Sequence, residues 1–167
     1  MKNLLILRHA SPAAQGTDGT DFTRPLTAHG EQEARMQGGF LREAGITLDV
    51  IATSTAVRAR TTAELLAAAL GQAPALTPDE TLYNAPGEVL LDYVQRLPER
   101  VQTVLLVAHM PGVAELLGLL ASDPAELSVA FSPCTLVGVS LEKAARWAEV
   151  KPGCGVVEWL LPPLFAK

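Results

Sequence analysis

The alternation of short apolar runs with helical segments constrains the fold of this chain more than any other feature. Residues 4–7 and 104–108 are unbroken apolar runs, which is typical of strands buried on both faces of a sheet. Further strands are predicted at residues 50–52, 135–141 and 156–161, the last two as a candidate hairpin. Helices are predicted at residues 28–44, 56–70, 90–97 and 113–120, from apolar side chains at helical spacing. Such alternation predicts an α/β fold class, in which a mostly parallel sheet lies between two helical layers in a three-layer α/β/α arrangement.

Two residues are expected to set helix ends. Thr27 is a candidate N-cap for the helix that begins near residue 28, because its hydroxyl can accept from a free backbone N–H of the first turn. Gly71 directly follows the helix that ends at residue 70, and glycine commonly terminates helices in the left-handed conformation.

The chain is expected to form one domain over residues 1–167. It has 167 residues, and neither a linker-like stretch nor a charge block divides it. With 49% hydrophobic and 19% charged residues, it can bury a sizeable core without disulfides or metal ions. This composition excludes intrinsically disordered, collagen-like and disulfide-stapled classes of protein. Cys134 and Cys154 are accordingly expected to be ordinary small apolar residues.

The net charge of the chain limits which partners it can attract. Thirteen basic and eighteen acidic side chains give a net charge of −5, so no general attraction to nucleic acid or anionic lipid is expected. No apolar run reaches the roughly 18–20 residues of a membrane span. The N-terminus lacks the long apolar region of a signal peptide. We therefore expect a cytoplasmic protein with neither a nucleic-acid nor a membrane partner, in which a local positive cluster holds any bound anion.

Two of the three histidines follow apolar strands directly. His9 ends the first run in L-R-H-A-S-P, and His109 ends another in V-A-H-M-P-G. In open α/β sheets, binding sites gather at the carboxyl ends of the strands. A single histidine in such a place is more often structural. Two at equivalent strand ends, one of them preceded by Arg8, favour a functional site.

Arg58 breaks a local rule of helix stability. The stretch T-S-T-A-V-R-A-R-T-T-A-E places it in the first turn of the helix after residues 50–52. Cations are disfavoured there, because the helix dipole is positive at the N-terminus. An anion-binding role would explain the exception, whereas Arg60 is interpreted as an exposed helix-face residue.

Together, these residues predict a phosphate pocket. Arg8 and Arg58 can clamp phosphoryl oxygens bidentately, and a histidine can attack phosphorus and carry the phosphoryl group. The acidic residues of the predicted loops are too scattered to indicate a Mg²⁺ site, so neither metal nor cofactor is predicted; they are Asp18, Asp21, Asp79 and Glu80.

At this point, the sequence resembles a known family. The stretches L-R-H-A, R-P-L-T-A-H-G-E-Q-E-A, S-T-A-V-R-A-R-T-T-A-E and V-A-H-M-P-G resemble the ordered motifs of the histidine phosphatase superfamily, over nearly the whole chain. The short length, R-H-A in place of the commoner R-H-G, and R-P-L-T are most similar to the SixA-type phosphohistidine phosphatase branch. The resemblance implies a phosphoglycerate mutase-like fold.

The resemblance also implies roles for single residues. His9 would be the nucleophile, transiently phosphorylated, while Arg8, Arg58 and His109 would bind the phosphoryl group and stabilise its transition-state charge. Arg24 matches the arginine of R-P-L-T; it would line the pocket entrance or, equally, hold its own turn. His29 is assigned to the exposed first turn of a helix and is given no role.

One part of the family pattern is missing. Larger members place a general-acid carboxylate after the third strand, where this chain reads D-E-T-L-Y-N-A-P-G-E, with Asn84 at the position of interest. Glu80 and Glu88 are the nearest candidates for the acid. An alkoxide leaving group usually needs a proton, whereas the imidazole of a phosphohistidine leaves more easily. The segment 71–86 is also too short for a large lid, and an open pocket suits a phosphorylated side chain of another protein.

The predicted function is therefore a metal-independent phosphatase with a covalent phosphohistidine intermediate and a phosphohistidine-bearing partner protein as substrate. The nearest alternative is a phosphatase for small phosphate esters, with Glu80 or a group of the substrate as acid. A non-catalytic module that binds phosphate or phosphoproteins is the alternative from another class. The presence of His9 argues against it, because binding alone needs no nucleophile.

Overall fold

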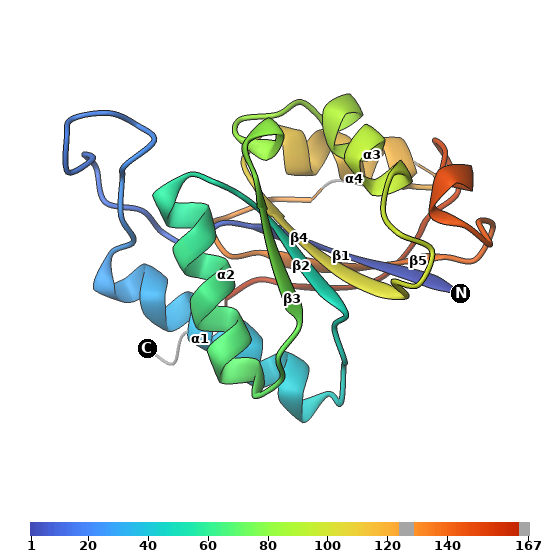
Figure 1. Ribbon diagram of the computed structural model, residues 1–167, viewed down its shortest axis with the longest axis horizontal. Helices are drawn as coiled ribbons and strands as arrows, with labels where there is room; N and C mark the ends of the chain where they lie inside the picture. Colours follow the sequence, from blue (N-terminus) through green and yellow to red (C-terminus); the bar gives the residue numbers. More distant parts are fainter. Residues whose placement is uncertain (124–128, 164–167) are drawn as a thin grey trace.

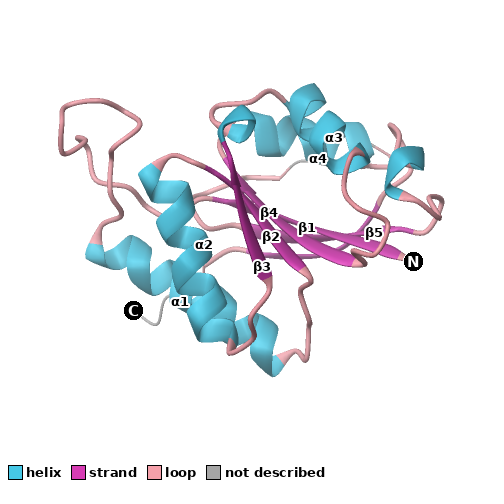
Figure 2. Cartoon of the chain, in the orientation of Figure 1, coloured by secondary structure: helices cyan, strands magenta, loops and turns pink. Residues whose placement is uncertain are grey.

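A six-stranded sheet forms the centre of the computed structural model, which describes residues 1–123 and 129–163 (Figures 1 and 2). The strands are β1 (Lys2–Arg8), β2 (Val50–Ser54), β3 (Ala75–Asp79), β4 (Thr103–Ala108), β5 (Leu136–Leu141) and β6 (Val156–Leu161), in the order β3-β2-β4-β1-β5-β6. The helices are α1 (Ala28–Glu43), α2 (Val57–Leu70), α3 (Gly87–Gln95) and α4 (Gly112–Leu120), with short 3₁₀ turns η1 (Glu80–Leu82) and η3 (Trp147–Glu149). Strands β1 to β4 are parallel to one another, β5 is antiparallel to β1, and β6 pairs with β5 as the predicted hairpin. The prediction of a mostly parallel sheet is confirmed.

Helices cover both faces of the sheet, because successive side chains of each strand point in opposite directions. Leu4 and Ile6 of β1 belong to the apolar cluster of α3 and α4, whereas Leu5 and Leu7 belong to the cluster of α1 and α2. Figure 1 shows the two helix pairs on opposite sides of the strands. The predicted three-layer α/β/α fold class is confirmed.

Strand β3 was not predicted from the sequence. It contains Pro78, which has no backbone N–H and therefore argues against a central strand, and its side chains are largely exposed. Its position at the edge of the sheet, paired only with β2, accommodates both features. Asp79, predicted in a loop, ends this strand and accepts a hydrogen bond from the Thr81 backbone N–H at 2.8 Å.

Both predicted helix ends are present. The Thr27 hydroxyl accepts from the Gly30 backbone N–H at 3.0 Å and caps α1. Gly71 follows α2 with φ of +71°, a left-handed conformation that glycine adopts without steric cost. Helix α2 begins three residues after β2 ends, so its first turn lies at the carboxyl edge of the sheet.

Cys134 and Cys154 are both free and buried, as expected, and burial raises the pKa of the Cys134 thiol. Among the described residues, no helix combines the length and the apolar character needed to cross a bilayer.

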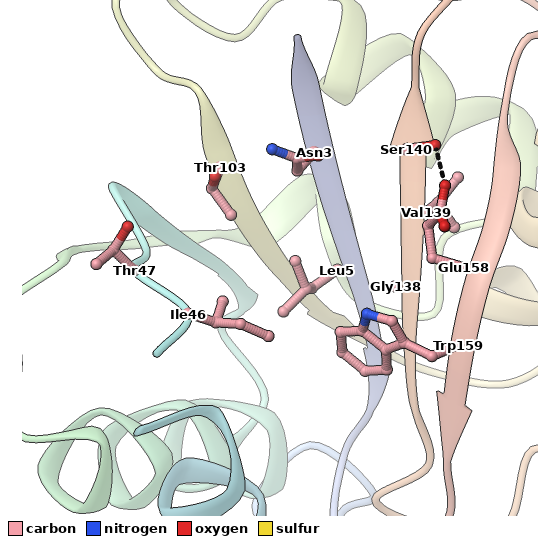
Figure 3. Close-up of a pocket in the computed structure, with 10 residues that line it drawn as sticks. All are labelled: Asn3, Leu5, Ile46, Thr47, Thr103, Gly138, Val139, Ser140, Glu158 and Trp159. Atoms are coloured by element: carbon pink, nitrogen blue, oxygen red, sulfur yellow. Dashed lines mark hydrogen bonds between the residues drawn. The ribbon is translucent and has the colours of Figure 1, made fainter. Parts of the chain in front are cut away.

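One cavity of about 300 Å³ lies on the face of the sheet beside the loop that follows α1 (Figure 3). The indole of Trp159 lies against Gly138, where a Cβ would collide with the ring. Ser140 donates to Glu158 at 2.6 Å on the cavity wall. Neither histidine nor arginine lines this cavity, so the predicted phosphate chemistry is not located there.

Candidate active site

The carboxyl ends of the neighbouring strands β1 and β4 bring His9 and His109 together. The two ring centroids are 5.1 Å apart, and the His9 backbone N–H donates to the Ala108 carbonyl at 3.1 Å. Arg58, in the first turn of α2, contacts both rings. All three side chains are buried, at 6% exposure or less. Three predicted site residues from distant segments therefore meet in one place.

His9 is held with Nε2 facing the Arg58 guanidinium. Its Nδ1 lies 2.8 Å from the Ala10 carbonyl oxygen, which can only accept, so Nδ1 carries the proton. Arg58 Nε donates to Nε2 at 3.3 Å, so Nε2 carries the lone pair. Burial, together with the charges of nearby arginines, lowers the pKa of His9 to about 4. The imidazole is therefore neutral at pH 7, with an unprotonated Nε2.

His109 is fixed by two contacts of its own. Arg58 donates from Nη2 to Nδ1 at 3.3 Å, and Nε2 lies 2.8 Å from the Ser54 hydroxyl at the end of β2. Because arginine only donates, Nδ1 accepts and Nε2–H donates to Ser54. Burial, followed by the neighbouring His9 and Arg58, lowers the pKa of His109 to about 3. Sequence reasoning missed Ser54, since its role appears only when β2 and β4 lie side by side.

Arg8 contributes a second guanidinium to the pocket. Its Nη1 donates to the Phe131 carbonyl at 2.6 Å. Its Nε is buried and has no hydrogen-bond partner among the described residues. A buried donor without a partner costs free energy, on the order of 1–3 kcal/mol. A phosphoryl oxygen is the kind of acceptor that would satisfy it.

Arg24 fulfils both of the interpretations that its motif allowed. Its Nε donates to the Ala13 carbonyl at 2.8 Å, which holds the turn between β1 and α1. Its Nη1 lies 3.0 Å from Asp21 Oδ1, and the side chain also lines the pocket.

Asp21 is a pocket residue that sequence analysis left in a loop without a role. Its Oδ2 accepts from Arg58 Nη2 at 2.9 Å and from the Tyr83 hydroxyl at 2.7 Å. Its carbonyl accepts from Arg58 Nη1 at 2.7 Å. The Tyr83 hydrogen bond, followed by those of Arg24 and Arg58, holds the pKa of this carboxyl far below its ordinary value. The sequence signal was weak: an acidic residue three positions before Arg24.

The cavity between these groups has a volume of about 310 Å³. Its lining residues are Arg8, His9, Pro12, Asp21, Arg24, Arg58, Asn84, His109 and Met110. The predicted site residues thus all line one pocket, while their chemical roles stay predictions.

Other candidates lie outside this cavity. Asn84 lines it, as its position in the family pattern implies, but neither Glu80 nor Glu88 does. Arg60 is exposed and pairs with Glu64 at 3.4 Å.

His29 is more than half exposed and lies 3.4 Å from Glu33 on α1. It does not line the cavity. Within residues 1–123 and 129–163, no group of three or more His, Cys, Asp or Glu side chains is placed to hold a metal ion.

Comparison with known proteins agrees with this geometry. The model of the histidine phosphatase superfamily (branch 1) matches residues 4–84. An uncharacterized protein of Mycobacterium tuberculosis is 36% identical over 157 residues, which span 90% of this chain and 96% of the relative. The phosphohistidine phosphatase SixA of Escherichia coli is 28% identical over 98% of this chain and 96% of its own.

Solved structures show the same relationship. A SixA structure from Nakamurella multipartitia superposes with a TM-score of 0.83 at 26% identity, over 98% of this chain and 97% of the other. A second SixA structure, from Agrobacterium tumefaciens, gives a TM-score of 0.80 at 26% identity, over 97% and 98% of the two chains. Motifs, fold and relatives agree, and the chain is a phosphatase that belongs to the histidine phosphatase superfamily, branch 1.

Proposed function

We propose that this phosphatase removes the phosphoryl group from a phosphohistidine of a partner protein, through a covalent intermediate on His9 and without a metal ion. The observation that carries the proposal is the state of His9, which is neutral, with its Nε2 lone pair facing the cationic pocket. A group that only bound phosphate would gain nothing from this tautomer. The similarity to proteins named phosphohistidine phosphatase supports the choice of substrate.

In the first step, the Nε2 lone pair of His9 forms a bond to phosphorus. The bond between phosphorus and the imidazole nitrogen of the substrate breaks, and its electron pair returns to that nitrogen. The substrate leaves as neutral imidazole if its other ring nitrogen carries a proton. Arg8 and Arg58 neutralise the charge on the three phosphoryl oxygens, which is the main task of a protein in phosphoryl transfer.

In the second step, water attacks phosphorus on the side that the leaving group has vacated. The bond from phosphorus to Nε2 breaks, its electrons return to Nε2, and inorganic phosphate forms with release of the proton of the water. The hydrogen bond from His9 Nδ1 to the Ala10 carbonyl keeps the ring oriented through both steps. Arg58 lies beside the reacting atoms and holds the phosphoryl oxygens, while the neutral ring of His109, 5.1 Å from that of His9, forms the pocket wall next to them.

The residues that line the pocket favour a leaving group that needs no proton from the enzyme. Asp21 is the one carboxylate among the described lining residues, and its three hydrogen bonds keep it ionised, so it is a poor proton donor. Hydrolysis of an alkyl ester would need a proton on the departing oxygen. Phosphohistidine does not have this requirement, because its leaving group is a far weaker base than an alkoxide.

A protein substrate fits the rim of the pocket. Phe22 and Met110 are each 38% exposed, although both side chains are large and apolar. Tyr83 lies between Phe22 and His109: its ring centroid is 5.3 Å from that of Phe22 and 5.6 Å from that of His109. Apolar side chains around a charged pocket are typical of surfaces that contact another protein.

The test of the intermediate uses radiolabelled phosphohistidine protein and rapid acid-free quenching. The native chain should carry the label on His9, in an acid-labile bond, whereas His9→Ala should neither carry it nor turn over. His29→Ala is the matched control, because this exposed histidine lies outside the pocket, and it should behave as the native chain does. Full activity of His9→Ala would show that the nucleophile is another residue.

A panel of substrates separates the proposal from its rivals. Phosphohistidine protein, an aryl phosphate and glycerol phosphate are compared by kcat/KM. Turnover of phosphohistidine far above glycerol phosphate supports the proposed substrate, and the reverse order supports the phosphatase for small esters. Binding of phosphate without turnover of any of them would identify a binding module.

A further inference from the structure

Asp21 is the acidic exception in an otherwise cationic pocket. Its two carboxylate oxygens contact Arg24 and Arg58 at 3.0 and 2.9 Å, and Tyr83 at 2.7 Å, so the carboxylate is held by three donors from three segments of the chain. The phosphoryl chemistry proposed above uses only cationic and neutral groups. A fixed negative charge in this place works against phosphate binding, and it needs an explanation of its own.

Asp21 lies nearer the mouth of the pocket than His9 does, on the side where a leaving group would depart. Arg58 lies between His9 and Asp21, since its Nε contacts the His9 ring and its Nη2 contacts the carboxylate. The Asp21 side chain is 46% exposed, whereas His9 is 6% exposed, so Asp21 lies nearer the mouth. In-line attack by His9 directs the leaving group outward, toward the mouth.

The charges of the pocket show what the carboxylate achieves. Arg8, Arg24 and Arg58 carry three positive charges among the lining residues and Asp21 carries one negative charge, with both histidines neutral, so the sum is +2. A phosphoryl group carries about −1.5 to −2 at neutral pH. The pocket therefore neutralises one phosphoryl group and has no positive charge left for a second anionic group beside it.

We propose that Asp21 is a specificity-determining residue, which makes the pocket accept a single phosphoryl group with a neutral or protonated neighbour and reject substrates that carry a second anion next to it. The inference rests on the proposed function and adds one condition on the substrate, namely that the group attached to the phosphoryl group carries no negative charge. A phosphohistidine ring, neutral or protonated, meets the condition. Bisphosphates, pyrophosphates and phosphorylated carboxylic acids do not.

The test compares two inorganic probes, phosphate and pyrophosphate, as competitive inhibitors of aryl phosphate hydrolysis in metal-free buffer. Asp21→Asn keeps the shape of the side chain and removes its charge. We expect Asp21→Asn to strengthen inhibition by pyrophosphate relative to inhibition by phosphate. The ratio of the phosphate inhibition constant to the pyrophosphate inhibition constant should rise about fivefold, the order expected of one partly exposed charge. An unchanged ratio overturns the proposal, even if both inhibitors bind more weakly, because Asp21 would then only hold Arg58 in place.

Two control variants make the comparison specific. Asp18→Asn removes another carboxylate of the same loop. The Asp18 carboxylate accepts hydrogen bonds from Thr20 and Thr23 and does not line the pocket, so the ratio of inhibition constants should stay as in the native chain. Tyr83→Phe removes a hydrogen bond to Asp21 but leaves its charge, so it too should leave the ratio unchanged. A shift in either variant equal to that of Asp21→Asn overturns the proposal.

The outcome does not depend on which substrate is physiological. The inhibition constants need only aryl phosphate hydrolysis, and calorimetric binding of the same two probes replaces them if Asp21→Asn has no measurable turnover. Failure of the native chain to hydrolyse phosphohistidine would overturn the proposed function. It would not affect the measured ratio of inhibition constants, on which the role of Asp21 depends. A constant ratio with normal phosphohistidine turnover would overturn the role of Asp21 alone.

Discussion

The Arg58 guanidinium donates through Nε to His9 Nε2 at 3.3 Å and through Nη2 to His109 Nδ1 at 3.3 Å. One side chain thereby fixes the direction of both imidazole lone pairs. The same guanidinium is the donor closest to the nitrogen proposed to attack phosphorus. A phosphoryl group held by Arg58 consequently lies next to His9, so binding and orientation depend on a single residue.

Arg58→Ala should therefore lower kcat/KM for aryl phosphate about 10²-fold or more, as loss of a charge-stabilising donor does in other active sites. Arg60→Ala is the matched control, two positions further on the same helix, exposed and paired with Glu64. It should change kcat/KM less than twofold. Equal losses in the two variants would mean that the wrong arginine has been placed in the pocket.

The pH dependence follows from the two buried histidines. The pKa of His9 is lowered to about 4 and that of His109 to about 3, from 6.5, chiefly by burial. Between pH 6.5 and 4, the unfolded chain binds more protons than the folded one, so the free energy of unfolding should fall as the pH falls through this range. NMR titration should find both rings neutral at pH 5.5, and denaturant unfolding should show lower stability at pH 5 than at pH 7. Titration of His9 near 6.5 would contradict its burial beside Arg58.

Local signals in the sequence were sufficient for five of the six strands and for Arg8, His9, Arg58 and His109 of the site. Unbroken apolar runs marked β1 and β4, and a histidine after each run indicated the carboxyl edge. Arg58 was found because a cation at a helix N-terminus opposes the helix dipole. Each of these features is visible within a few neighbouring residues.

The parts that were missed depend on contacts between distant segments. Asp21 lies 37 positions from Arg58, in a polar loop whose composition is that of any exposed turn. Ser54 acquires its partner, His109, only when β2 pairs with β4. Strand β3 contains Pro78 and is half exposed, so neither periodicity nor composition distinguishes it from a loop.

Metal chelation should leave the rate unchanged. Arg8, Arg24 and Arg58 place three positive charges around one cavity, and in the proposed mechanism these take the place of the charge stabilisation that Mg²⁺ provides in other phosphoryl-transfer enzymes. The measurement is kcat/KM for aryl phosphate with and without EDTA. An EDTA-sensitive rate that added Mg²⁺ or Zn²⁺ restores would contradict the metal-independent mechanism.

The apolar rim should matter only for a protein substrate. Phe22 lies beside Tyr83 at the pocket mouth but does not line the cavity, so Phe22→Ala should leave aryl phosphate hydrolysis within about twofold. Loss of an apolar contact of this size at an interface costs about 1–2 kcal/mol, so KM for phosphohistidine protein should rise roughly 5- to 30-fold. Met36→Ala removes a similarly exposed apolar side chain from α1 and should change neither substrate. Equal effects of Phe22→Ala on both substrates would argue against a docking rim.

The last prediction concerns the leaving group. The walls of the pocket offer Asn84 where a general acid is expected, and neither Glu80 nor Glu88 lines the cavity. General acid catalysis contributes about 10²–10⁴-fold, so its loss corresponds to roughly 3–5 kcal/mol against alkyl esters. Phosphohistidine and aryl phosphates should therefore turn over well and glycerol phosphate poorly. Glu80→Gln should leave all three rates unchanged.

Adding a carboxyl to the pocket tests whether a missing proton donor limits the hydrolysis of alkyl esters. Asn84 has φ of +48°, a left-handed conformation that aspartate also tolerates, so Asn84→Asp can place a carboxyl in the pocket wall with little backbone strain. If a missing proton limits alkyl esters, this variant should raise kcat/KM for glycerol phosphate about tenfold below pH 6, where part of the new carboxyl is protonated, and leave phosphohistidine unchanged. If Glu80→Gln instead abolished glycerol phosphate hydrolysis while phosphohistidine turnover persisted, Glu80 would be the acid. The pocket would then have to change shape during turnover to bring this residue to the leaving oxygen, and small phosphate esters would become the favoured substrates.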